Sequence, residues 1–291
     1  MIKIGFLGYG TRALDYLMEH PRFEVKYFFA PEAKLCQDVY DAQERYRDCL
    51  KMEVIRNEEQ LALRFGQILD VDCFLMNACP IILHREALSQ MRVFNIHPGD
   101  LRYNRGHQPH CWTVLLGERM TKIVLHTVGE AIDAGAVIKS VDIGVLAGES
   151  AGDVLNHAED KIPILLDGLY LHLTEQTDYE MVVENGGYRN VMSYEDYRIH
   201  LAIDTEEQMS RKILSRSTYH GAFFIYDQKR IYVDALISYK EYQERQDSAI
   251  TIQMEEKEGL VYIHSIWRSM VFRLNKIEQA EDMLMWQDGL S

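Results

Sequence analysis

The first two-thirds of the chain alternates buried strands with helices, and this order restricts the fold more than any other feature. Apolar runs predict strands at Ile2 to Leu7, Phe23 to Phe29, Met52 to Ile55, Val71 to Met76 and Arg92 to Ile96. Helical spacing predicts the segments between them, at Ala13 to Met18, Cys36 to Leu50, Glu58 to Gln67 and Ile82 to Gln90. Strand–helix–strand units of this kind predict an α/β fold with a doubly wound, mostly parallel, Rossmann-like sheet.

The next segments continue the same domain. We expect a helix at Pro109 to Leu116, with Trp112 on its buried side, and strands at Lys122 to Val128 and Ala136 to Ile143. One long helix is predicted from Ser150 to Thr174, capped by Ser150.

The pattern changes near Ile203. A capping pattern at 204–207 predicts a short helix. Five short strands follow, at Ala222 to Tyr226, Arg230 to Ile237, Ala249 to Met254, Leu260 to His264 and Met270 to Leu274. We therefore expect two domains, an α/β domain over residues 1–200 and a small β-rich, barrel-like or compact-sheet domain over residues 201–291, with residues 288–291 frayed.

Composition excludes several classes of protein. The formal charge is −14, from 31 basic and 45 acidic residues, and no block of Lys and Arg suits an extended nucleic acid. No apolar run approaches the ~20 residues of a membrane span, and Met1 to Gly8 reads as a strand rather than a secretory signal. The five cysteines form no C-x-x-C pair, which indicates reduced thiols and a cytoplasmic protein.

One amide, one imidazole and one carboxylate stand out. Asn95 and His97 end the strand that reaches Pro98, and Asp133 follows 36 residues after His97. Ligands of such sheets lie beyond the carboxyl ends of the strands, where Asn95 and His97 fall. The amide and imidazole can hold an oxyanion, the imidazole can take a proton, and the carboxylate can orient the imidazole. The set suits transfer of a formyl group to an amine, although each residue alone could simply cap or satisfy a turn.

Two other patterns indicate neither a dinucleotide site nor a metal site. Gly8-Tyr9-Gly10 begins like a dinucleotide fingerprint, but Ala13 stands where the third glycine would be, and a plain strand-to-helix turn is favoured. His97, His107, His110 and His126 lack the spacing of a zinc site, so we expect no metal.

The segment around His97 resembles a known family. Asn95-Ile96-His97-Pro98, Arg105-Gly106, Pro109 and Trp112 are spaced as in the 10-formyltetrahydrofolate-dependent formyltransferases, and residues 130–138 are similar to the family's second motif. The family includes the methionyl-tRNA, glycinamide ribonucleotide and sugar N-formyltransferases. The β-rich tail resembles the tRNA and sugar branches. The resemblance implies that residues 1–200 form the catalytic domain and that Asn95, His97 and Asp133 are catalytic.

The resemblance also implies a co-substrate and its binding residues. The co-substrate would be 10-formyltetrahydrofolate, bound by Asn77, Ala78, Cys79, Ile81, Ile82, Leu83, Val128, Glu130 and Ile132. Substrate binding is assigned to Gly8, Tyr9, Gly10, Thr11, Arg102, Tyr103, Asn104, Arg105 and His107. The cations and aromatic residues among them are as readily explained as solvated loop residues, and Arg105 as a brace of the loop.

The acceptor is the open question. The family's serine, leucine and proline after His-Pro are replaced by Gly99, Asp100 and Arg102, which puts the substrate in doubt more than the reaction. The acidic chain favours a nucleotide-linked amino sugar. Methionyl-tRNA formyltransferase, formyltetrahydrofolate hydrolase and an inactive binding module stay as alternatives; a hydrolase would usually carry an added N-terminal regulatory domain. The apolar β-rich tail suggests a homodimer, and the sequence identifies neither the sugar nor the nucleotide.

Overall fold

The computed structural model describes residues 1–181, 186–242, 253–265 and 268–279. Contacts divide the chain into two compact units. The N-terminal unit comprises Met1–Pro109, Met120–Gly144 and Leu155–Asn190; the C-terminal unit comprises His110–Arg119, Val145–Val154 and Val191–Ser291. The domain boundary expected at residue 200 stays a prediction. The compact units divide at Val191, and two earlier segments, His110–Arg119 and Val145–Val154, belong to the C-terminal unit.

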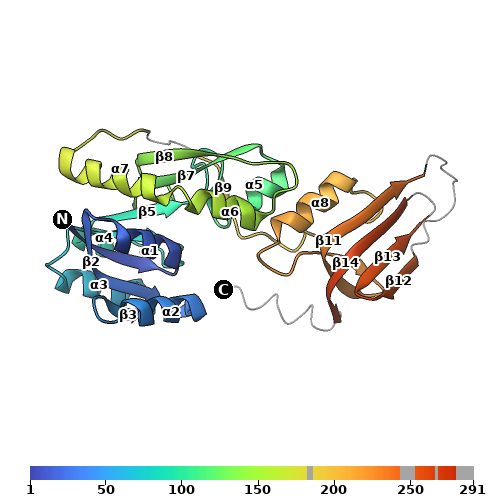
Figure 1. Cartoon of the computed structure of the whole chain (residues 1–291), viewed down its shortest axis with the longest axis horizontal. Helices are drawn as coiled ribbons and strands as arrows, with labels where there is room; N and C mark the ends of the chain where they lie inside the picture. The colour runs from blue at the N-terminus through green and yellow to red at the C-terminus, as the bar shows by residue number, and fades with distance from the viewer. Residues whose placement is uncertain (182–185, 243–252, 266–267, 280–291) are drawn as a thin grey trace. The chain divides into compact units, whose positions relative to one another are not determined.

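The N-terminal unit is built on a seven-stranded sheet with strand order β3-β2-β1-β4-β5-β7-β8 (Figure 1). Its strands are β1 (Ile2–Gly8), β2 (Phe23–Pro31), β3 (Lys51–Ile55), β4 (Cys73–Asn77), β5 (Val93–His97), β7 (Met120–Thr127) and β8 (Val137–Gly144). The first five run parallel, while β7 and β8 are antiparallel to their neighbours. The predicted mostly parallel α/β sheet is therefore confirmed.

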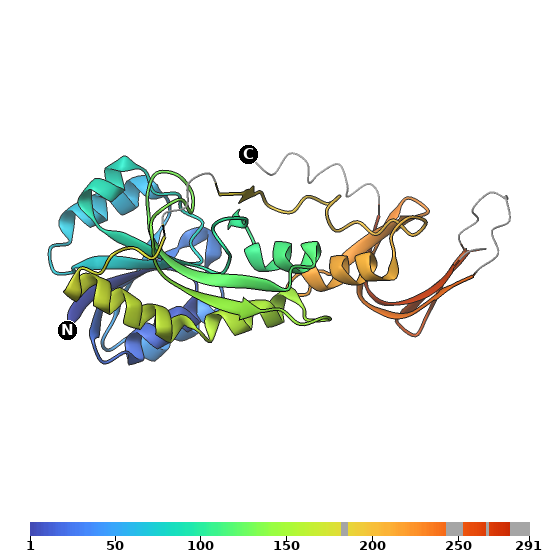
Figure 2. The ribbon, with the colours of Figure 1, turned by 90° about the horizontal axis from the view of Figure 1, so that it is seen from above.

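Helices cover both faces of this sheet. They are α1 (Thr11–Glu19), α2 (Gln37–Tyr46), α3 (Glu58–Gln67), α4 (Arg85–Gln90) and α7 (Ile162–Glu175), with a short 3-10 turn at Glu32–Lys34. Residues alternate along β1, so that Phe6 joins one apolar cluster with α1, α2 and α7, and Leu7 joins another with α3 and α4. Figure 2 shows α7 lying beside the green strands β7 and β8. Burial on both faces is the reason these strands read as continuous apolar runs.

Two predicted helices differ from the structure. The single helix expected from Ser150 to Thr174 is two helices, α6 (Ala151–Glu159) and α7, because Pro163 cannot continue a helix and stands in the first turn of α7. Ser150 does cap α6, since its hydroxyl accepts from the Asp153 N–H at 3.2 Å. The helix expected from Ile82 begins at Arg85 instead, and 82–84 form a loop.

The C-terminal unit contains a five-stranded antiparallel sheet of order β10-β11-β14-β13-β12. The strands are β10 (Ala222–Tyr226), β11 (Lys229–Glu241), β12 (Gln253–Lys257), β13 (Leu260–His264) and β14 (Arg268–Gln279). Within the described part, β10 and β12 are the edges, so the strands form the compact sheet rather than a closed barrel. Most of the strand expected at 249–254, and the fraying expected at 288–291, lie outside the described residues.

Two helices pack in this unit, α5 (Pro109–Leu116) and α8 (Glu206–Ser215). Trp112 of α5 is partly buried against the unit's apolar cluster, as the sequence predicted. Thr205 and Gln208 form the predicted capping box of α8. The sequence did not predict a two-stranded pairing in the N-terminal unit, between β6 (Arg105–Gly106) and β9 (Tyr188–Arg189).

Candidate active site

The candidate site forms where neighbouring strands of the N-terminal unit end. Register pairs Gly8 with Asn77 and Met76 with Asn95, so the carboxyl ends of β1, β4 and β5 share one edge. The antiparallel strand β7 then sets His126 directly opposite Asn95. The edge therefore collects an amide and two imidazoles from adjacent strands, as ligand sites in open α/β sheets do.

The Asn95 amide lies between two acceptors. Its Nδ2 is 3.1 Å from Nε2 of His126 and donates to Oδ1 of Asp133 at 3.3 Å. The other ring nitrogen of His126, Nδ1, lies 2.8 Å from the Thr127 carbonyl oxygen. A carbonyl only accepts, so Nδ1 carries the proton and Nε2 of the neutral ring has a lone pair. Both amide hydrogens of Asn95 thus have acceptors within the protein.

His97 is fixed by a main-chain group. Its Nε2 donates to the Asn104 carbonyl at 2.7 Å, and its Nδ1 lies 3.4 Å from Oδ2 of Asp133. Burial is the largest influence on His97 and lowers its pKa, while Asp133 and the Asn104 carbonyl offset only part of that effect. The neutral ring therefore carries its proton on Nε2, and a further proton would enter at Nδ1, facing the carboxylate.

Asp133 joins the cluster from a strained turn. Its φ is 48°, in the left-handed region, which Asp tolerates better than most residues. Its Oδ2 accepts from the Gly106 N–H at 2.8 Å, and its Oδ1 lies 3.5 Å from Nε2 of His126. Burial alone would raise the pKa of Asp133, but the two imidazoles and the Gly106 N–H outweigh it and lower the pKa well below its usual range.

The loop between β5 and α5 covers this cluster. Asn95 and His97 are 6% and 4% exposed, while the Asp133 side chain keeps 12%. A Cβ atom at Gly99 would lie 2.9 Å from Nε2 of His97 and 3.0 Å from the Asn104 carbonyl oxygen. The glycine at position 99 therefore allows the loop backbone to approach the imidazole. The site is nearly closed, but it is polar throughout.

The two segments predicted to bind the cofactor border one apolar cluster. Cys79, Ile81 and Val128 all pack against the cluster that contains Leu83. Asn77 is buried, and its amide donates to the Ile96 carbonyl at 3.2 Å. The remaining predicted residues are more varied: Ala78 has a φ of 51°, and Ile82, Glu130 and Ile132 are exposed.

The opening glycine turn packs on the same strand end. A Cβ atom at Gly8 would lie 1.9 Å from the Asn77 carbonyl oxygen, and one at Gly10 would lie 1.8 Å from the Asn77 Oδ1. Gly8 also has a φ of +140°. These approaches explain both glycines without any phosphate. Tyr9 and Thr11 are half-buried beside them.

The cations predicted to bind substrate have protein partners. Arg102 makes a forked pair with Asp100, with Nη2 2.6 Å from Oδ2. Arg105 is buried and donates to the Leu101 carbonyl at 3.0 Å, which suits a brace of the loop. Asn104 is fully buried, whereas Tyr103 and His107 are exposed. Of the loop's side chains, the two exposed rings are the best placed to meet a ligand.

Sequence reasoning missed two parts of the cluster. His126 was considered only as a metal ligand, although its place in a strand antiparallel to β5 would have set it beside Asn95. The Asn104 contribution comes from a main-chain carbonyl, which no residue pattern reveals. Across the described ranges, no group of three or more His, Cys, Asp or Glu side chains is arranged to hold a metal ion.

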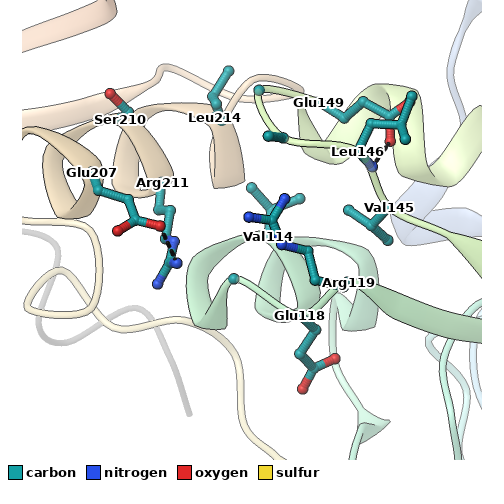
Figure 3. A pocket seen from close by; sticks show the side chains of 13 residues that line it. Val114, Glu118, Arg119, Val145, Leu146, Glu149, Glu207, Ser210, Arg211 and Leu214 are labelled. Carbon is teal, nitrogen blue, oxygen red and sulfur yellow. Dashed lines mark hydrogen bonds and ion pairs between the residues drawn. The ribbon is translucent and has the colours of Figure 1, made fainter.

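A cavity in the C-terminal unit has a different character (Figure 3). It measures about 140 Å³ and lies between α5, α8 and residues 145–149. Arg211 pairs with Glu207, and Glu149 accepts from the Leu146 N–H at 2.7 Å. Val114, Val145 and Leu214 supply apolar walls, and no histidine lines it. A cavity of this size and lining does not suit a folate or an acyl transfer.

The five cysteines are unpaired, in agreement with the expected reduced thiols. No helix in the described part of the chain is long and apolar enough to cross a bilayer.

Comparison with known proteins gives one family match. Residues 33–166 match the family model described as formyl transferase. A methionyl-tRNA formyltransferase of Flavobacterium psychrophilum is 30% identical over 79 residues. That alignment covers 27% of this chain and only 24% of the relative.

Solved structures share the fold. A sugar N-formyltransferase from a Shewanella species superposes with a TM-score of 0.66 at 15% identity, covering 81% of this chain and 97% of that one. The N-formyltransferase of Helicobacter canadensis, solved with folinic acid and dTDP-3-aminofucose, has a TM-score of 0.61 at 16% identity. The second comparison covers 95% of this chain and all of the other.

Proposed function

We propose that this chain, whose residues 33–166 match the formyl transferase family model, moves a formyl group from 10-formyltetrahydrofolate to the amine of a nucleotide-linked amino sugar. The observation that carries the proposal is the convergence of Asn95, His97 and Asp133 at the carboxyl edge of the sheet. An amide donor, an imidazole and a carboxylate are the groups that such a transfer uses. The Asp133 carboxylate lies 3.3 Å from the Asn95 amide and 3.4 Å from the His97 ring.

The surroundings of the cluster fit a folate. Cys79, Ile81 and Val128 form an apolar boundary, and exposed Ile82 and Ile132 add apolar surface on the two predicted segments. A flat aromatic ring needs such surface together with a few polar groups. When bound, 10-formyltetrahydrofolate would supply the activated formyl group.

The protein's part is to stabilise charge and take a proton. As the acceptor amine attacks the formyl carbon, negative charge develops on the formyl oxygen, which the N–H groups of Asn95 and His97 would stabilise. The carbon–amine bond would form first, and the proton lost by the amine would pass to His97, directly or through a water. The carbon–N10 bond would then break as the carbonyl re-forms, and His97 would return the proton to N10, so that neutral tetrahydrofolate leaves. Between these two proton transfers, Asp133 stabilises the imidazolium of His97.

Every donor of this set is engaged in the present structure. Nε2 of His97 is held by the Asn104 carbonyl, and both amide hydrogens of Asn95 have acceptors. Substrate must therefore exchange at least one of these contacts. The loop that carries Asn104 would have to move if Nε2 is the atom exchanged.

The acceptor assignment has less support than the reaction. The Helicobacter canadensis enzyme with dTDP-3-aminofucose has the same fold, and fold alone does not establish a substrate. The 79-residue match to a methionyl-tRNA formyltransferase keeps that function as a second candidate. The charge of −14 argues against an RNA acceptor, because neutralising phosphates requires clustered cations.

A panel of acceptors tests the proposal. Purified protein is incubated with 10-formyltetrahydrofolate and each of several uridine-, thymidine-, cytidine- and guanosine-linked amino sugars, and mass spectrometry reads the gain of one formyl group. Methionyl-tRNA and an acceptor-free reaction are run alongside, with Asp133→Asn as the inactive control. Formylation of the tRNA alone, or loss of formyl to water alone, would replace the sugar assignment.

Two further properties are part of the proposal. A cytoplasmic location agrees with the unpaired cysteines. A homodimer agrees with the exposed isoleucines at positions 225, 237 and 277 on the antiparallel sheet. Sedimentation at micromolar concentration tests the dimer, and a single monomer boundary would exclude it.

A further inference from the structure

A second histidine stands beside the catalytic set without a role in the transfer described above. His126 is 1% exposed and lies opposite Asn95 in the register of β5 and β7. Its ring has three polar neighbours: the Thr127 carbonyl oxygen 2.8 Å from Nδ1, and the Asn95 amide at 3.1 Å and Asp133 Oδ1 at 3.5 Å from Nε2. A buried imidazole with both nitrogens engaged has a fixed tautomer and a fixed orientation.

The first contact determines the second. Because the Thr127 carbonyl can only accept, Nδ1 of His126 must donate, and Nε2 is left as an acceptor in the neutral ring. Nε2 therefore faces the NH₂ group of Asn95 rather than its carbonyl oxygen. Asp133 Oδ1, 3.3 Å from the same NH₂ group, demands the same orientation. An inverted amide would place its oxygen against a lone pair and a carboxylate.

We infer that His126 is a positioning residue, whose Nε2 lone pair holds the Asn95 amide with its N–H groups, and not its oxygen, at the reaction centre. This rests on the proposed formyl transfer. When the formyl oxygen arrives, one amide hydrogen turns to it from Asp133, and the other stays on His126. The Asp133 contact, at 3.3 Å against 3.1 Å, is the longer of the two and the one to be exchanged.

Replacing His126 by each of the two amide residues distinguishes the contributions of its two ring nitrogens. His126→Gln places its oxygen near the position of Nε2 and can still accept from Asn95. His126→Asn reaches only the position of Nδ1, so it keeps the Thr127 contact and loses the contact to Asn95. We expect His126→Gln to retain kcat within ~3-fold and His126→Asn to lose ~10- to 100-fold with little change in KM for the formyl donor, because an oriented oxyanion donor is worth up to ~10²–10³. Equal losses in both variants would overturn the inference.

A double-mutant cycle distinguishes positioning from general destabilisation. In an Asn95→Ala background, His126→Asn should cost less than ~3-fold further, since its effect acts through the amide that has been removed. Additive losses would show that His126 acts by another route. Leu125→Ala is the matched structural control: this neighbour in β7 is fully buried in the apolar cluster on the opposite face, so it should lower stability and leave kcat within ~3-fold.

A spectroscopic readout needs no substrate. Long-range proton–nitrogen correlation spectra of ¹⁵N-histidine-labelled wild-type protein should show one protonated and one unprotonated nitrogen for His126, with the proton on Nδ1. A proton on Nε2 would overturn the inference even in an active enzyme. If the acceptor panel shows no formyl transfer but the tautomer is as expected, the proposed function fails while the Asn95–His126 contact stands.

Discussion

The two units bury polar side chains in opposite ways. In the N-terminal unit, Asn95, His97 and His126 lie buried at one sheet edge and are joined in one contact network with half-buried Asp133. In the C-terminal unit the buried polar side chains lie in separate sets, none of which includes a histidine in the described residues. Arg230 lies over the Tyr194 ring at 3.9 Å, and Lys212 donates to Asp204 at 2.7 Å.

Strand direction explains the contrast. Parallel strands end at the same edge, so residues that follow them meet. Antiparallel strands end alternately at both edges, and their buried polar residues meet aromatic rings and backbone instead. Buried polar side chains therefore indicate a reaction site only where several of them share one contact network.

The largest expected effect separates a buried basic side chain of the N-terminal unit from one of the C-terminal unit. His97→Ala should lower the rate of formyl transfer about 10³-fold, because it removes both the donor and the proton acceptor. Arg230→Gln, equally buried in the C-terminal unit, should change the rate less than ~3-fold even if it lowers stability. Steady-state rates with the best acceptor, and circular dichroism for folding, provide the measurement. A comparable loss in both variants would show that burial alone, and not membership of the contact network, decides the effect on the rate.

The packing of the glycine turn on Asn77 comes next. Gly8→Ala combines a positive φ with a Cβ atom 1.9 Å from a backbone oxygen that cannot move aside, so it should destabilise the protein by more than ~2 kcal/mol. Gly144→Ala is the control, because no heavy atom lies within 4 Å of its Cβ position. Denaturant unfolding compares the two. A Gly8→Ala protein as stable as Gly144→Ala would contradict the described approach.

Acid should weaken the N-terminal network in two steps. The folded pKa of His97 lies below its ordinary value of 6.5, so the unfolded chain binds more protons and stability is lost as pH falls through that window. The folded pKa of Asp133 lies below its ordinary value of 3.8, so its contribution is present above that value and is lost at lower pH. Unfolding free energies from about pH 7 to about pH 3 measure this. His97→Gln should flatten the first step, and an unchanged pH profile would refute it.

The smallest effect compares one helix cap from each unit. Asn57 accepts from the Gln60 N–H at 3.0 Å at the start of α3, and Thr205 caps α8. Replacing either by Ala should cost about 1 kcal/mol. Hydrogen exchange should accelerate in α3 for Asn57→Ala and in α8 for Thr205→Ala. Acceleration in the same peptides for both variants would show that the caps do not act locally.

Much of the fold followed from the sequence, because its elements carry local signals. The bounds of α3, β10 and β13 match the expected segments, since turns and caps delimit each of them. The break before α7 was missed because the periodicity of leucine and isoleucine continues across Pro163, and the pattern outweighed the one residue that cannot sustain it. The helix expected from Ile82 begins only at Arg85, because Leu83 is apolar for burial in the loop that precedes the helix, while Ile82 is exposed.

The candidate site was predictable in its side chains and not in its main chain. Asn95, His97 and Asp133 carry the chemistry in their residue types, so a sequence pattern can select them. The partner of His97 Nε2 is the main-chain carbonyl oxygen of Asn104, which does not depend on the side chain at that position. Gly99 makes room for the loop backbone beside the imidazole. His126 required knowledge that β7 runs antiparallel to β5, which only the assembled sheet provides.

Because His97 contacts the backbone of Asn104, a substitution of the Asn104 side chain leaves the hydrogen-bond partner of the imidazole unchanged. Any amino acid at position 104 brings the same oxygen, so substitutions at loop positions other than Gly99 can alter which acceptor binds while the ring keeps its hydrogen-bond partner. Such substitutions can change which acceptor is formylated without changing how His97 takes up the proton. A change in the length of the loop would alter both acceptor binding and proton transfer.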